Sequence, residues 1–141
     1  MYAQRAAQAY SQVGLETGVA AASPHRLILM LYDGALRAIA DAVAHLGAGR
    51  IPDKGLAISK AIGVIEEGLK PSLDPTKGGA IAEHLMQLYD YMSRRLLLAS
   101  LRNDVAGFDE VAALLRELRG AWTAIDQAPS TAASRPELAT V

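Results

Sequence analysis

The sequence contains no cysteine, which excludes disulfide bonds, a thiol nucleophile, and zinc or iron–sulfur sites with cysteine ligands. Aromatic residues are also scarce, at 5% of the 141 residues. No apolar run approaches the length of a transmembrane helix, and the N-terminal residues lack the continuous apolar stretch of a secretory signal. We therefore expect a soluble cytoplasmic protein that does not insert stably into a membrane.

Neither sign of charge predominates, since 14 lysines and arginines face 15 aspartates and glutamates. This balance argues against a protein that binds nucleic acid through a basic surface. Hydrophobic residues make up 51% of the chain, which is enough to build a core. Alanine and leucine, which lead the scale of helix propensity, are the most frequent residues. The composition therefore predicts an all-α domain without a nucleic-acid partner.

Helix-breaking and helix-capping residues divide the chain into four helical stretches. Ser23 followed by Pro24 is typical of an N-cap and a first helical turn. The connections are a few residues long, and short connections favour antiparallel neighbours. We expect an antiparallel up-down four-helix bundle over residues 23–127. Its helices are predicted at about 24–46, 52–70, 79–102 and 104–127.

The two ends of the chain differ from this bundle. Residues 1–22 are rich in small and polar residues and are interrupted by Gly14 and Gly18, so we expect a separate N-terminal capping segment. Residues 128–141 are small, polar and aperiodic, which predicts a disordered tail.

A search for catalytic chemistry finds little. No glutamate precedes His25, His45 or His84 by three residues, as a di-iron bundle would require, and no nucleophile stands beside a base. A phosphorelay built around His84 is one alternative, although a solvated histidine is commoner at such a position. We favour a non-enzymatic binding protein without a cofactor or a metal.

Several apolar or small residues remain outside the main core stripes of the predicted helices. The first helix is apolar over an unusually wide arc, the second carries a line of small residues beside its isoleucines, and the third contains three consecutive leucines that cannot all face one core. We predict that the leftover residues form a groove for another chain, although ordinary packing between helices is an equally open alternative. The candidates are Leu29, Leu36, Ala57, Ala61, Val64 and Gly68, with Leu97 and Leu98 as weaker ones.

Two short elements carry a family resemblance. LYDGA spans residues 31–35, LYDYM spans residues 88–92, and AYSQV at residues 9–13 precedes both. In this order and spacing, the chain resembles the flagellin-specific export chaperones of bacteria over about residues 9–126. The resemblance implies a cytoplasmic helical bundle that holds the disordered C-terminal segment of flagellin, prevents premature polymerisation, and presents flagellin to the flagellar type III export apparatus. A chaperone or regulator of another flagellar client is the alternative, and other flagellar regulators are possible partners.

The N-terminal segment yields a separate hypothesis. Tyr10 and Val13 stand three residues apart, so one helical turn could dock both on an apolar surface. The resemblance places this tyrosine in a motif. We therefore predict that residues 2–18 cover part of the client groove in the free protein and are displaced when the client binds.

Overall fold

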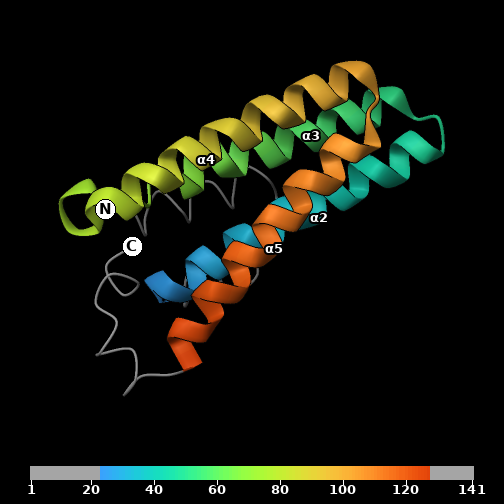
Figure 1. Cartoon of the computed structure of the whole chain (residues 1–141). Helices are drawn as coiled ribbons and strands as arrows, with labels where there is room; N and C mark the ends of the chain where they lie inside the picture. Colours follow the sequence, from blue (N-terminus) through green and yellow to red (C-terminus); the bar gives the residue numbers. More distant parts are fainter. Residues whose placement is uncertain (1–22, 128–141) are drawn as a thin grey trace.

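The computed structural model describes residues 23–127, which form four α-helices and no strand (Figure 1). The predicted all-α four-helix fold is confirmed. The predictions made for residues 1–22 and 128–141, including those for Tyr10 and Val13, lie outside the described residues. The helices are α2 (Pro24–Gly47), α3 (Ile51–Val64), α4 (Pro75–Arg102) and α5 (Val105–Gln127), and a π-helical turn, η1 (Ile65–Leu69), continues α3.

Local side chains set the ends of the helices. Ser23 is the N-cap of α2, and its hydroxyl accepts a hydrogen bond from the backbone N–H of Arg26 at 3.2 Å. Asp74 caps α4 in the same way through the backbone N–H of Thr76 at 3.0 Å. Asn103 ends α4 in the left-handed conformation, with φ at 53°, which asparagine tolerates better than most residues.

Two helices depart from the predicted boundaries. The predicted helix over 52–70 begins at Ile51 and changes to π-helical hydrogen bonding over its last turn, where the N–H of Lys70 donates to the carbonyl of Ile65 at 2.9 Å. The third helix has an extra turn from Pro75, and Gly79, with φ at 54° and ψ at −128°, interrupts it. Because glycine adopts positive φ freely, the long part of α4 starts there, as predicted.

The four helices form a ring in which α2 packs against α3 and α5, and α4 closes the ring by packing against α3 and α5. α2 and α4 therefore face each other across the core. The largest fully buried side chains come from all four helices. They include Leu31, Ile39, Ile58, Tyr89, Leu96, Phe108 and Leu115.

A buried lysine joins the start of α3 to the end of α4. Lys54 is 5% exposed, and its Nζ donates to the carbonyl oxygen of Ser100 at 2.6 Å and to its hydroxyl at 3.1 Å. A cation is stabilised near the C-terminus of a helix, where carbonyl groups lack partners within the helix. This contact fixes the last turns of α4 against α3.

Candidate functional site

The polar contacts between α4 and α5 lie close to the loop that joins them. Nε of Arg95 donates to Glu110 at 2.8 Å, and the guanidinium of the same arginine lies 3.6 Å from Asp104. Tyr91 also donates a hydrogen bond to Glu110. These contacts with Tyr91 and Arg95 lower the pKa of Glu110, so its carboxylate form is favoured. They hold the end of α4 against the start of α5.

The second half of α5 makes its polar contacts with α2 instead. Arg119 lies 2.5 Å from Asp33, and this contact raises the pKa of the arginine. Nε1 of Trp122 donates to the backbone carbonyl of His25 at 3.1 Å, and the two rings stack with centroids 4.8 Å apart. α5 therefore leaves α4 along its length and ends beside the start of α2 (Figure 1).

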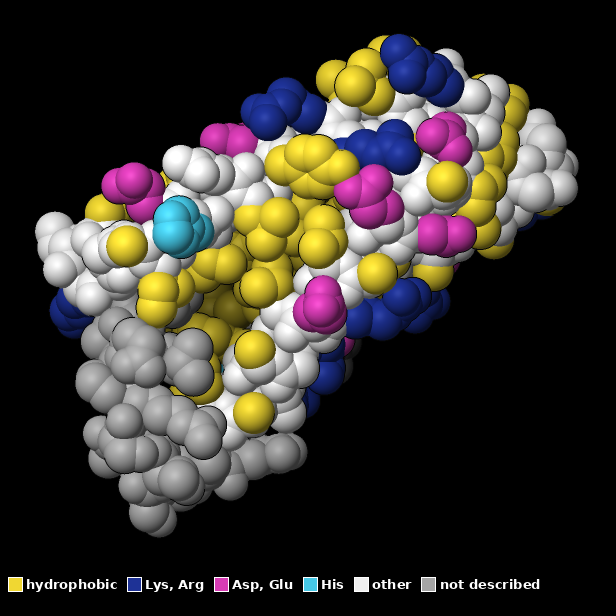
Figure 2. All heavy atoms as spheres, in the orientation of Figure 1, with side chains coloured by type: hydrophobic (Ala, Val, Ile, Leu, Met, Phe, Trp, Pro, Cys, Tyr) yellow, Lys and Arg dark blue, Asp and Glu magenta, His cyan; other side chains and the backbone are white. Residues whose placement is uncertain are grey.

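This divergence leaves an apolar cleft, which we call the α4–α5 cleft. Figure 2 shows a hollow lined with hydrophobic side chains between the first half of α4 and the second half of α5. Several apolar side chains of these two helices pack against the core but remain partly accessible to solvent. They are Leu85 and Leu88 on α4, and Leu114, Leu118 and Trp122 on α5.

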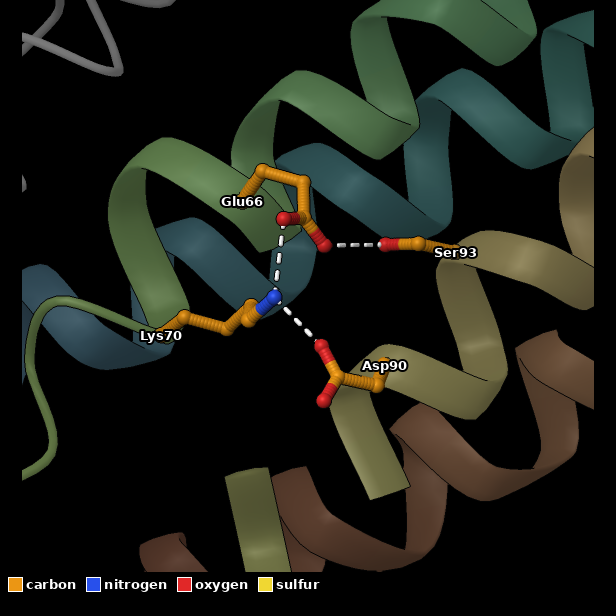
Figure 3. A network of polar contacts seen from close by, with 4 residues as sticks. All are labelled: Glu66, Lys70, Asp90 and Ser93. Atoms are coloured by element: carbon orange, nitrogen blue, oxygen red, sulfur yellow. Dashed lines mark hydrogen bonds and ion pairs between the residues drawn. The ribbon is translucent and has the colours of Figure 1, made fainter. Parts of the chain in front are cut away.

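A network of polar contacts holds η1 against α4, the helix that forms one wall of this cleft (Figure 3). Nζ of Lys70 lies 2.5 Å from Asp90 and 2.8 Å from Glu66, and the hydroxyl of Ser93 donates to Glu66 at 2.7 Å. The contact with Asp90, followed by that with Glu66, raises the pKa of Lys70. Lys70 is shared by two carboxylates, one on η1 and one on α4, so the network positions α4 against η1.

The small residues predicted to line a groove lie inside the bundle. Ala57, Ala61 and Val64 are between 0% and 6% exposed and belong to the hydrophobic core, and Gly68 is also buried. They pack within the chain itself and offer no open groove in this structure. This burial corresponds to the alternative of ordinary interhelical packing.

The predicted leucines fall in different places. Leu29 is 8% exposed and Leu36 is partly buried against the core, so neither presents a free surface. Leu97 and Leu98 are 53% and 45% exposed, and they lie on the half of α4 that is held against α5, away from the cleft. The structure does not bring the predicted residues together at one site.

The apolar spacing of the third and fourth predicted helices indicates core stripes that contain Leu85, Leu88, Leu118 and Trp122. That spacing gives no sign of their accessibility, and Leu114 lies outside the stripes. A helical stripe shows which residues face inward, but it carries no sign of where two helices separate. The pair formed by Trp122 and His25, which draws α5 toward α2, joins residues 97 positions apart in the sequence.

Within residues 23–127, no three His, Asp or Glu side chains are grouped so as to hold a metal ion. None of the helices in that part of the chain is long and apolar enough to span a bilayer.

Comparison with known proteins identifies the family. A family model described as "Flagellar protein FliS" matches residues 6–129. The chain belongs to the FliS family. It is 49% identical over 135 residues to the flagellar secretion chaperone FliS of Salmonella typhimurium, which covers 96% of this chain and 100% of that protein. Its identity to the FliS protein of Escherichia coli is 45% over 122 residues, covering 86% of this chain and 90% of that protein.

A second FliS-type chaperone, FliSB of Pseudomonas aeruginosa, is 45% identical over 125 residues, covering 89% of this chain and 98% of that protein. These FliS relatives confirm the resemblance based on LYDGA and LYDYM. They place the chain among flagellar secretion chaperones, a class that is not an enzyme class.

Proposed function

We propose that this chain is a cytoplasmic, non-enzymatic chaperone that binds the C-terminal segment of flagellin, and that the α4–α5 cleft receives this segment. The observation that carries the proposal is the open apolar surface between two diverging helices, in a member of a secretion-chaperone family. Residues 23–127 leave this hollow open to solvent, and burying its apolar surface against an apolar partner would be favourable.

The cleft suits a segment that folds as it binds. Leu88 and Leu118 come from opposite walls and are both partly exposed, so a helix placed between them would bury apolar surface on two sides. A disordered segment can adopt an amphipathic helix in such a groove, with anchors spaced three or four residues apart. Flagellin bound in this way keeps its C-terminal segment from pairing with other subunits. The complex can then be presented to the flagellar export apparatus without any cofactor.

One observation also favours a broader range of clients. Hydrophobic side chains line the hollow in Figure 2, and such a surface would recognise shape and hydrophobicity rather than a charge pattern. An apolar helix from another flagellar protein could occupy the same surface.

The N-terminal segment completes the proposal. Tyr10 and Val13 belong to a segment that competes with the client for the cleft. Deleting residues 1–16 should leave the bundle folded and the affinity for the client equal or higher, because no competitor has to be displaced. Weaker binding with an unchanged fold would mean that Tyr10 contacts the client directly.

The test is a titration of the full chain with a peptide from the flagellin C-terminus. We expect a 1:1 complex, a rise in helicity on binding, and slower polymerisation of intact flagellin in the presence of the chain. A peptide of the same composition in scrambled order serves as the control. If neither the peptide nor intact flagellin binds while another flagellar client does, the proposal for flagellin is overturned in favour of the alternative.

A further inference from the structure

The second half of α4 exposes an apolar stripe on the side away from the core. Leu97, Leu98 and Leu101 are 53%, 45% and 73% exposed, and they follow one another within about one helical turn. Together with Arg94, they lie at positions i, i+3, i+4 and i+7, so all four share one face of the helix. We call the surface formed by these four residues and the adjacent Arg102 the outer α4 face.

The outer α4 face carries positive charge that the described part of the chain does not neutralise. Arg94 and Arg102 are exposed and form no ion pair with any residue between 23 and 127. Glu110 and Asp104, on the start of α5 and the loop before it, pair with Arg95 instead. The stretch of α4 from residue 91 to residue 102 contains no acidic residue.

We propose that the outer α4 face docks an amphipathic helix of a partner protein whose apolar stripe is flanked by aspartate or glutamate. The three leucines supply a contact seam with the spacing at which one helix packs along another. Arg94 and Arg102 stand on either side of this seam along the helix, so each can pair with a carboxylate of the partner. The surface is separate from the α4–α5 cleft, which is built from the other half of α4.

Charge distinguishes this occupant from two others. A second copy of the chain would bring the same arginines against Arg94 and Arg102, and like charges across an interface oppose association. An anionic membrane is recognised by clusters of about four to eight basic residues, whereas this face presents two. A partner that combines apolar and acidic side chains satisfies both features of the surface.

The test uses the full chain and two synthetic helical peptides. Both peptides carry the same leucine stripe, which is flanked by glutamates in one and by lysines in the other. We expect the glutamate peptide to bind more tightly, with an affinity that falls as salt is added. The double variant Arg94→Glu/Arg102→Glu should lose about tenfold in affinity for the glutamate peptide and gain affinity for the lysine peptide. Arg116→Glu, which changes an exposed arginine of α5, should leave both affinities unchanged.

Other results would overturn the proposal. Equal affinity for the two peptides, or no effect of the charge reversal, would remove the role of the arginines. Concentration-dependent dimerisation that is lost in Leu97→Glu/Leu101→Glu would assign the face to a second copy. Arginine-dependent sedimentation with phosphatidylserine vesicles would assign it to a membrane. Loss of flagellin-peptide binding in Arg94→Glu/Arg102→Glu would join this face to the client site, whereas failure of flagellin to bind the unmodified chain would count only against the proposed function.

Discussion

The hydroxyl oxygens of Tyr32 and Tyr89 lie 2.6 Å apart in the interior of the bundle. Tyr32 belongs to α2 and Tyr89 to α4, so this hydrogen bond joins the two helices that face each other across the core. Both side chains are nearly inaccessible to solvent, at 4% and 2% exposed. The bond fixes the α4 wall of the cleft relative to α2, since a buried hydroxyl that loses its partner is costly.

Replacing both tyrosines of this pair should therefore cost less than the sum of the two single replacements. Tyr89→Phe leaves the Tyr32 hydroxyl buried without its partner, and we expect a loss of about 1–3 kcal/mol in the free energy of unfolding. In Tyr32→Phe/Tyr89→Phe no hydroxyl remains unsatisfied, so the loss should be smaller than the sum of the two single losses. Urea denaturation of the four proteins measures this coupling. Strictly additive losses would show that the hydrogen bond contributes nothing.

The same pair predicts reduced stability in alkali. Burial is the first cause that raises the pKa of Tyr89 well above its ordinary value, with the neighbouring Tyr32 adding to the effect, and burial also raises the pKa of Tyr32. In the unfolded chain both phenols ionise near pH ~10. Because the folded pKa is the higher one, the stabilisation is complete below pH ~10 and is lost as pH rises toward the folded value. The free energy of unfolding should fall as the pH rises above ~10, with a shallower slope in Tyr32→Phe/Tyr89→Phe. An identical slope in both proteins would be inconsistent with this origin.

A close approach of α4 and α5 depends on Gly107. A Cβ at this position would lie 2.6 Å from the Cβ of Ala99 and 2.7 Å from an Arg95 guanidinium nitrogen. Gly107→Ala should therefore destabilise the bundle by about 1–3 kcal/mol, despite the higher helix propensity of alanine. Gly120→Ala, on the same helix but with nothing within 4 Å of the added Cβ, should stabilise it by up to about 1 kcal/mol. Thermal unfolding compares the two, and a stabilising Gly107→Ala would show that the helices are not tightly apposed there.

The charge network around Lys70 should add a modest, salt-sensitive contribution. The Lys70 side chain is 19% exposed, and it pairs with Asp90 and Glu66. Lys70→Met leaves two carboxylates facing each other, and we expect a loss of about 1–2 kcal/mol that shrinks in 1 M salt. Lys60→Met, which changes an exposed lysine without an ion pair in the described part of the chain, is the control. Equal unfolding free energies for both variants and the unchanged chain would mean that the network does not hold η1 to α4.

The helices and most of the core were predictable from the sequence because caps and apolar spacing are local signals. Ser23 with Pro24 and the break at Gly79 are read directly along the chain, and the structure places helix starts at both. The LYDGA and LYDYM elements also indicated the family, but the sequence did not show the structural role of their residues. In the structure their tyrosines pair with each other, and their aspartates, Asp33 and Asp90, each pair with a cation of another element.

The candidate site was harder to predict, because it depends on how helices separate rather than on what each helix contains. Ala61 and Leu88 show the two reasons. In the sequence, a small residue beside a core stripe is compatible with an open groove or with a closely packed neighbouring helix. The structure shows the second arrangement, because Ala61 is fully buried. A leucine in a core stripe is expected to be fully buried, but it stays partly exposed where the neighbouring helix turns away. Leu88 is such a residue, since it is only partly buried. Such crossing angles arise from long-range packing that periodicity along one helix does not encode.

The most direct measurement is the affinity of the flagellin C-terminal peptide for two variants of the cleft, determined by calorimetry. Leu88→Gln and Leu118→Gln change one residue on each wall, and Leu56→Gln makes the same change at a 65% exposed leucine of α3. Because burying a leucine side chain contributes about 1.5–3 kcal/mol, each cleft variant should bind about tenfold or more weakly, while Leu56→Gln binds like the unchanged chain. Circular dichroism checks that all three variants remain folded. Unchanged affinity in both folded cleft variants would contradict the assignment of the client to the α4–α5 cleft.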